Sequence, residues 1–268
     1  MEINDIIERV REKSPLIHSI TNPISINQCA NALLAIGARP IMAEHPKEVH
    51  EITETADALY LNLGNITDAR MESMMISIKT AKEKGIPVTL DLVGIACSAL
   101  RKNFVQQLIK THVPTIIKGN YSEIAALYDS GYTSAGVDAD GALTTESIAN
   151  LAAKLSEKLN TVVLASGKTD VICGDGRVLY VRNGTPQLSR VTGTGCILGA
   201  LCACFATVGD SLEAATAACA VLGISGEWAE TDRGGGTFMV NLIDNLTTLS
   251  RKQIEKYFRY EEKHYEKI

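Results

Sequence analysis

The sequence lacks any apolar run that approaches the roughly 20 residues of a membrane-spanning helix. Its first residues, MEINDIIERVREK, lack the apolar core of a signal peptide. An excess of positive charge is also missing, because the formal net charge of the 268 residues is −5. Nucleic acid and anionic membranes are therefore poor partners for this chain. We expect a cytoplasmic protein with no membrane and no nucleic-acid partner.

The cysteines lack the spacing of a metal or redox site. There are seven of them, none in a CxxC pair, and most lie in apolar surroundings. An odd number of scattered cysteines favours reduced thiols over a disulfide framework or a zinc site. What the chain does have is apolar material for a core, since 46% of its residues are hydrophobic.

Short apolar segments alternate with helical patterns along most of the chain. We predict strands over 15–21, 40–43, 58–63, 87–91, 114–118 and 161–165, and a hairpin from 171 to 182 around Asp175-Gly176. Helices are expected between them and over 195–208, 211–231, 238–249 and 251–266. This alternation predicts an α/β fold of three α/β/α layers with a mostly parallel central sheet. The only linker-like segment, 129–141, is too short to divide the chain, so we expect a single domain over 1–268.

One stretch, VTGTGCILGALCACF over 191–205, combines closely spaced glycines with the most apolar segment of the chain. We interpret it as a tight turn that leads into a buried helix. The unpaired amides and positive dipole end of such a helix form an anion site. Gly193, Thr194, Gly195 and Cys196 therefore become candidates for holding a phosphoryl group in transfer.

Two other interpretations of this glycine stretch stay open. Its spacing resembles a dinucleotide-binding fingerprint with one residue too many, although the preceding residues 187–190 make a poor strand. The glycines are also compatible with a helix start that binds no ligand.

Polar residues are expected to gather where the parallel strands end. Asp91 ends one strand, the end of the next carries Lys118, Asn120 and Glu123, and the end of the third carries Ser166. Ligands of open α/β sheets bind outside the carboxyl ends of the strands. Two acids suit Mg²⁺, and a lysine suits a phosphate. Each residue also has a plain structural interpretation: Asp91 and Glu123 as helix-start or loop residues, and Lys118 as a surface residue.

Four motifs, ITNPISINQCANALLAIGARPIMA (20–43), LNLGNI (61–66), TIIKGNYSEIAAL (115–127) and VTGTGC (191–196), occur in this order over nearly the whole chain. Together they resemble the hydroxyethylthiazole kinase family, a thiamine-pathway branch of the ribokinase-like superfamily. The resemblance implies a kinase that uses ATP and Mg²⁺ to phosphorylate the primary alcohol of 5-(2-hydroxyethyl)-4-methylthiazole. It also implies a homotrimer with active sites between subunits.

The resemblance assigns roles to individual positions. Met42 and Gly193 are expected to contact the thiazole, and Asn22 to wall its pocket. Lys118 and Ser166, with Asn120 beside them, are expected to contact ATP, and Asp91 and Glu123 to serve magnesium. Gly193 to Cys196 are expected to form the anion hole.

This chain departs from its apparent relatives in two places. Leu92 stands where proline is common, which is expected to loosen the loop after Asp91, and Lys118 stands where arginine is frequent. Cys196 occupies a turn position where related sugar kinases carry an aspartate base. A helix N-terminus can lower a thiol pKa, but we expect Cys196 to assist mainly by position. A kinase for another alcohol such as hydroxymethylpyrimidine, a dinucleotide-dependent oxidoreductase and a non-catalytic binding homologue remain as alternatives.

Overall fold

The computed structural model describes residues 3–129, 131–133 and 143–265. Most of the linker-like segment 129–141 therefore lies outside the described residues. The strands are β1 (Leu16–Ile20), β2 (Arg39–Ile41), β3 (Ala58–Asn62), β4 (Val88–Asp91), β5 (Ile116–Asn120), β6 (Val162–Ser166), β7 (Asp170–Gly174), β8 (Arg177–Val181) and β9 (Tyr260–His264). They form one sheet in the order β2-β1-β3-β4-β5-β6-β7-β8-β9, parallel from β2 to β6 and antiparallel beyond.

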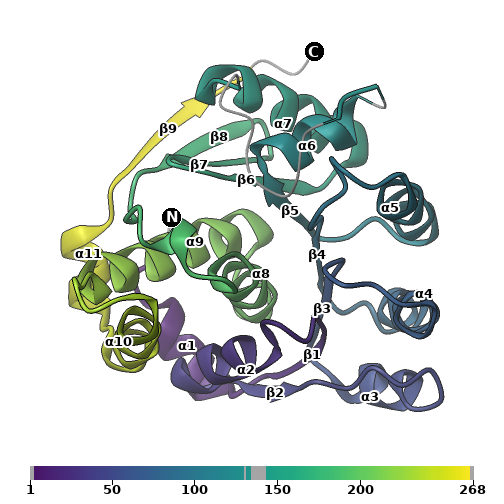
Figure 1. The fold of residues 1–268 in the computed structure, drawn as a ribbon, viewed down its shortest axis with the longest axis horizontal. Coiled ribbons are helices and arrows are strands. Elements are labelled where there is room, and N and C mark those ends of the chain that lie inside the picture. Colours follow the sequence, from purple (N-terminus) through teal and green to yellow (C-terminus); the bar gives the residue numbers. More distant parts are fainter. Residues whose placement is uncertain (1–2, 130, 134–142, 266–268) are drawn as a thin grey trace.

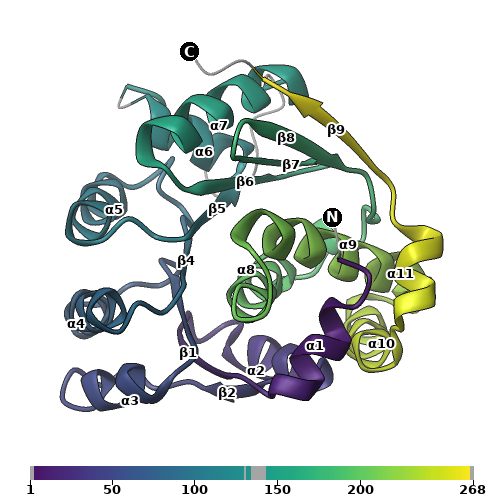
Figure 2. The ribbon, with the colours of Figure 1, turned by 180° about the vertical axis from the view of Figure 1, so that it is seen from behind.

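Helices cover both faces of this sheet (Figure 1). One face carries α3 (Val49–Thr55), α4 (Asp68–Lys84), α5 (Ala99–Thr111), α6 (Tyr121–Tyr128) and α7 (Thr145–Leu159). The other carries α1 (Ile6–Lys13), α2 (Ile26–Ala35), α8 (Thr194–Phe205), α9 (Ser211–Ala229), α10 (Gly235–Thr248) and α11 (Arg251–Tyr257), as the view from behind also shows (Figure 2). The predicted three-layer α/β/α architecture is confirmed.

The two faces of the sheet bury separate apolar cores because side chains alternate along each strand. In β3, Leu59 and Leu61 join the core under α4 and α5, whereas Tyr60 joins the core under α8 and α9. Helix α8 is apolar on all sides and almost entirely buried, and α9 packs along it. The most apolar stretch of the sequence is thus the central helix of one layer.

Local signals set several boundaries. Thr67 accepts a hydrogen bond from the Arg70 amide and caps α4, and Gly85 ends that helix at φ 67°. In the β7–β8 hairpin, Asp175 and Gly176 both have positive φ, as the two-residue turn requires. No helix among the described residues has the length and apolar character needed to cross a membrane.

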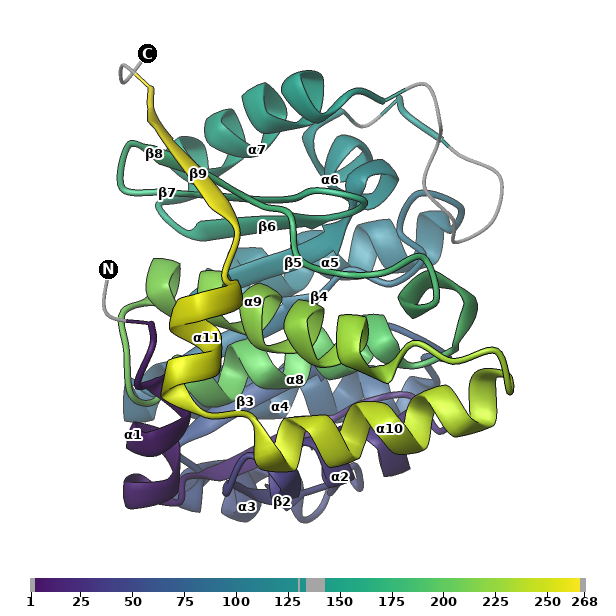
Figure 3. The same ribbon diagram turned by 90° about the vertical axis from the view of Figure 1, so that its left-hand side faces the viewer.

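The predicted helix over 251–266 is wrong in its second half. Helix α11 ends at Tyr257, and β9 then pairs with β8 at the edge of the sheet, reaching along it in Figure 3. Segment YEEKH has no apolar alternation, because β9 is an exposed edge strand held by backbone bonds and by ion pairs such as Arg182–Glu261. Phe258 stacks on Tyr260 with ring centroids 4.5 Å apart where the strand begins.

Candidate functional site

The carboxyl edge of the parallel strands places most of the predicted polar residues side by side. Asn62, Asp91 and Lys118 are register partners on β3, β4 and β5, so they project from the same face of the sheet toward α8. We call these three residues the polar row. Asp91 is fully buried and Lys118 is 4% exposed, so the interpretation of Lys118 as a surface lysine is wrong.

Asp91 and Lys118 form a buried ion pair. Lys118 Nζ donates to both carboxylate oxygens of Asp91, at 3.1 and 3.2 Å. The Tyr60 hydroxyl and the Asn62 amide each donate to Asp91 Oδ2 at 3.0 Å. Burial raises the pKa of Asp91, and Lys118 with these donors opposes that rise. Burial lowers the pKa of Lys118, but the Asp91 and Glu123 carboxylates and the hydrogen bond to Asp91 together outweigh it, so the net direction is upward.

The start of α8, which we call the glycine turn (Gly193–Cys196), lies against this ion pair. Lys118 Nζ also donates to the Gly195 carbonyl at 3.0 Å, and Tyr60 is within hydrogen-bond distance of the Cys196 carbonyl, also at 3.0 Å. Gly195 itself is exposed. The glycine turn therefore reaches the surface beside the buried charges.

Backbone geometry explains why this segment is rich in glycine. Gly193 has φ 98°, a conformation that side chains disfavour, and its carbonyl accepts the first helical bond from Ile197 at 2.9 Å. The amides of Thr194, Gly195 and Cys196 precede that bond and so lack a helical acceptor. A Cβ at Gly199 would lie 2.6 Å from the Tyr60 ring. Gly199 therefore lets α8 approach the sheet closely enough for its first turn to reach the polar row.

The Thr194 hydroxyl does not face the glycine turn's open side. It is buried and donates to the Leu188 carbonyl at 2.7 Å, which ties α8 to the short 3₁₀ helix Leu188–Arg190. This 3₁₀ helix also replaces the strand that a dinucleotide fingerprint needs before its glycines. The dinucleotide interpretation is therefore not supported by the local structure.

Two asparagines surround the sulfur of Cys196. Asn22 Nδ2 lies 3.3 Å and Asn62 Nδ2 3.4 Å from Cys196 Sγ. Asn22 Oδ1 accepts from the amides of Ile24 and Ser25, and Asn62 Oδ1 accepts from Gly64, so both carboxamides are oriented by backbone donors. Burial and the Asp91 charge raise the pKa of the Cys196 thiol. The helix N-terminus therefore does not produce a thiolate here, contrary to the possibility raised by the sequence.

Glu123 is held in a structural role at the start of α6. Its carboxylate accepts from the amides of Asn120 and Gly94, each at 2.7 Å, and Asn120 completes the capping box by accepting from the Glu123 amide. Glu123 thereby fixes the loop after Asp91. That loop is not loosened by the absence of proline, because the buried Leu92 donates its amide to the Lys118 carbonyl at 2.8 Å, a bond that proline cannot make.

Met42 and Ser166 lie toward the two ends of the carboxyl edge. Met42 follows β2 and packs partly buried against the core under α8. The Ser166 hydroxyl donates to the Gly119 carbonyl at 3.3 Å, at the end of β6. With strands about 4.8 Å apart, Met42 is separated from Asp91 by three strand spacings, roughly 14 Å, and Ser166 by two, roughly 10 Å. The structure thus places Asp91 between the predicted acceptor and nucleotide residues.

Tyr60 and Asn62 were not predicted as site residues. The signal available in the sequence was a polar residue at the end of an otherwise apolar strand, ALYLN, since a buried asparagine needs partners.

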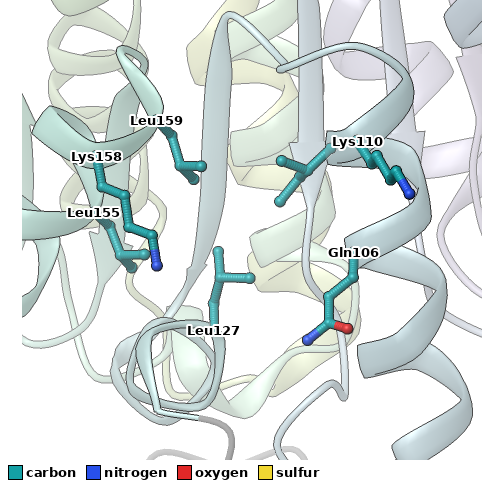
Figure 4. A pocket seen from close by; sticks show the side chains of 7 residues that line it. Gln106, Lys110, Leu127, Leu155, Lys158 and Leu159 are labelled. Atoms are coloured by element: carbon teal, nitrogen blue, oxygen red, sulfur yellow. The ribbon is translucent and has the colours of Figure 1, made fainter.

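A separate pocket of about 260 Å³ lies between α5, α6 and α7, with Lys110, Leu127 and Lys158 around it (Figure 4). None of the predicted site residues lines it.

Comparison with known proteins identifies the kind of site. The model of the hydroxyethylthiazole kinase family matches residues 7–252. The chain belongs to the hydroxyethylthiazole kinase family. It is 44% identical over 259 residues to hydroxyethylthiazole kinase 1 of Clostridium botulinum, an alignment that covers 95% of this chain and 98% of the relative. The family assignment makes the protein a small-molecule kinase.

Solved structures agree with this assignment. A hydroxyethylthiazole kinase protein from Pyrococcus horikoshii OT3 superposes with a TM-score of 0.89 at 34% identity, covering 98% of this chain and 99% of that one. A ribokinase-like superfamily protein from Enterococcus faecalis V583 gives a TM-score of 0.66 at 13% identity, covering 95% and 94%. The second likeness concerns the fold alone, and it confirms the predicted ribokinase-like architecture.

Proposed function

We propose that the polar row and the glycine turn transfer the γ-phosphoryl group of ATP to the primary hydroxyl of 5-(2-hydroxyethyl)-4-methylthiazole. The observation that carries this proposal is the position of Lys118 Nζ, which contacts the Asp91 carboxylate and the Gly195 carbonyl together. This contact ties a buried charge to the end of α8 that offers unpaired amides. Phosphoryl transfer requires mainly such positioning and charge stabilisation.

Each group has a defined task in this proposal. The amides of Gly195 and Cys196 hold the oxygens of the migrating group, and Lys118 adds a positive charge beside them. Asp91 keeps Lys118 charged and in place. Cys196, with its raised pKa, stays a neutral thiol that packs beside the reacting oxygen and does not act as a thiolate base.

Magnesium is expected to arrive with ATP. Among the described residues no cluster of three or more metal-binding side chains exists. This fits Mg²⁺ in kinases, which is bound through one or two carboxylates, water and substrate phosphates. Asp91 and Glu123 are the carboxylates at this edge, and each Glu123 oxygen accepts one backbone hydrogen bond, which leaves a lone pair. Bound there, Mg²⁺ would neutralise phosphate charge.

We further propose that the chain works as one kinase domain in a cytoplasmic homotrimer with sites at subunit interfaces. All nine strands of the described residues join one sheet, which supports a single domain. Ile24 beside the site, Leu34 on α2 and Val240 on the adjacent α10 are more than half exposed, which supports a subunit contact there.

Light scattering should give three times the 28.8 kDa monomer mass. Leu34→Asp should lower the measured mass. Leu100→Asp, the same change at a similarly exposed position on α5, should leave the mass unchanged.

The test of function is ADP release with ATP, Mg²⁺ and a panel of alcohols, with the phosphorylated product identified by mass spectrometry. Hydroxyethylthiazole should be the best acceptor. Faster turnover of hydroxymethylpyrimidine would reassign the substrate. If neither alcohol caused ADP release, the proposal would be rejected. Lys118→Met should abolish turnover, whereas Lys154→Met, the same change at an exposed position on α7, should leave it intact.

A further inference from the structure

The connection from β1 to α2 contains buried polar atoms that lack a partner. Within the part of the chain that the structure describes, Thr21 Oγ1, Ser25 Oγ and Gln28 Oε1 make no hydrogen bond. Ser25 is 0% and Thr21 1% exposed. An unsatisfied buried hydroxyl costs about 1–3 kcal/mol, so such a group is normally paired.

Ser25 is unusual in its helix as well. It is the N-cap residue of α2, where a serine hydroxyl ordinarily accepts an amide from the first turn. Here the hydroxyl makes no capping bond. Asn22 instead accepts the Ser25 amide through its side chain and its carbonyl, both at 3.1 Å. The Ser25 hydroxyl is thus free of its own helix.

The Ser25 side chain lies against the glycine turn. A Cβ placed on Gly193 would lie 3.4 Å from Ser25 Cβ and 3.8 Å from Gln28 Cδ, so these two side chains flank Gly193. Ser25 also borders the thiols of Cys29 and Cys196. Burial raises the pKa of both thiols and the neighbouring Ser25 hydroxyl opposes that rise, yet the contact lacks hydrogen-bond geometry.

Another buried hydroxyl without a partner, that of Ser77, lies inside α4 on the opposite face of the sheet from the glycine turn (Figure 1). Position singles out Ser25, because its side chain lies against Gly193, the residue that precedes the amides proposed to hold phosphate. An acceptor molecule entering this space must bring an alcohol oxygen close to those amides.

We propose that Ser25 is a specificity-determining residue that binds the hydroxyl of the acceptor substrate. The alcohol O–H donates to Ser25 Oγ, which leaves an oxygen lone pair directed toward the γ-phosphorus above the glycine turn. As the new P–O bond forms, the bond to ADP breaks, and the alcohol proton passes to an oxygen of the transferred phosphoryl group. Gln28 provides a second polar contact on the same side of Gly193. This inference rests on the proposed function and adds the group that recognises the acceptor hydroxyl.

The test compares two ligands that differ at that hydroxyl. Calorimetry would measure binding of 5-(2-hydroxyethyl)-4-methylthiazole and of 4,5-dimethylthiazole to full-length wild type, Ser25→Ala and Ser25→Thr. Since one hydrogen bond contributes about 0.5–1.5 kcal/mol, Ser25→Ala should weaken binding of the alcohol by about 2- to 13-fold. The dimethyl compound should change by less than about 2-fold, and Ser25→Thr should keep the preference for the alcohol. Ser77→Ala, at a similarly buried and unpaired hydroxyl, should change neither ligand.

If Ser25 had a purely structural role, Ser25→Ala would lose affinity for both ligands equally, and that result would overturn the proposal. ADP release by the wild type would still support the kinase function in that case. An unchanged alcohol affinity in Ser25→Ala would overturn it as well. If the wild type neither bound the alcohol nor released ADP with it, the proposed function would fail and the Ser25 contact with it.

Discussion

Charged residues gather at two edges of the sheet, and only one edge buries them. At the carboxyl edge, Asp91 and Lys118 are almost fully buried and pair with each other. Lys118 also donates to the Gly195 carbonyl of the glycine turn. Along β9, Glu261 pairs with both Arg182 and Lys263 in the solvent. Because solvent screens exposed pairs and burial penalises an unpaired charge, the same kind of contact should matter very differently at the two edges.

The largest effect is expected from breaking the buried pair. Lys118→Met leaves the Asp91 carboxylate buried and without its cation, so it should lower the free energy of unfolding by about 3–5 kcal/mol. It should also reduce kcat by at least about 100-fold, through loss of charge stabilisation. Urea unfolding and ADP release would measure the two effects.

A second variant separates stability from chemistry. Adding Asp91→Asn to Lys118→Met removes the uncompensated charge, so the double variant should regain part of the lost stability and none of the activity. If Lys118→Met were as stable as the wild type, the pair would not be buried as described.

Next in size is the effect of separating α8 from the sheet. In Gly199→Ala the new methyl group would meet the Tyr60 ring, and overpacking of this kind costs about 1–3 kcal/mol. The first turn of α8 should shift away from Lys118, so kcat should fall more than the affinity for ATP. Gly236→Ala is the matched control, since its methyl would meet nothing within 4 Å. Equal melting temperatures and equal rates for both variants would show that close approach of α8 is unimportant.

A smaller effect is expected at Asp170, where the parallel part of the sheet meets the antiparallel part. Although part of this residue reaches the surface, burial of its carboxyl group raises the pKa to about 6. Because the pKa is raised in the folded protein, the Asp170 carboxyl ionises at a lower pH in the unfolded chain. Wild-type stability should therefore fall as pH rises from about 4 to 6 and then level off. Across this pH range, the free energy of unfolding of the wild type should fall by about 1–2 kcal/mol relative to that of Asp170→Asn, as measured by thermal unfolding. A constant difference between the two proteins would contradict the burial of this carboxyl.

The smallest effect belongs to the β9 edge. Arg182→Ala removes an exposed ion pair with Glu261 and should change the free energy of unfolding by less than about 1 kcal/mol, with less effect still at high salt. Turnover should not change. A loss comparable to that of Lys118→Met would remove the distinction between the two edges.

The same contrast explains what the sequence could predict. The parallel strands were predictable because buried strands are continuous apolar runs, and their carboxyl ends necessarily meet at one edge. Asp91 and Lys118 followed from that rule. Strand β9 was not predictable, because an edge strand such as YEEKH is held by backbone bonds that leave no apolar pattern.

Side-chain roles at the site were harder to predict than positions. Glu123 was predicted as a metal ligand, with a helix-start role as the alternative, and its hydrogen bond from the distant Gly94 amide, which fixes the loop after Asp91, could not be predicted. Tyr60 was not predicted as a site residue, because its hydroxyl finds partners only in the folded protein, at Asp91 and the Cys196 carbonyl. Spacing along the chain does not reveal such contacts between distant segments.

The most direct test of the central claim is a crystal structure with ADP, aluminium fluoride and the thiazole alcohol. The fluoride complex, which stands in for the migrating phosphoryl group, should lie within about 2.7–3.2 Å of the Gly195 and Cys196 amides, beside Lys118. A complex bound with the fluoride group away from the glycine turn would contradict the assignment of phosphoryl transfer to the start of α8.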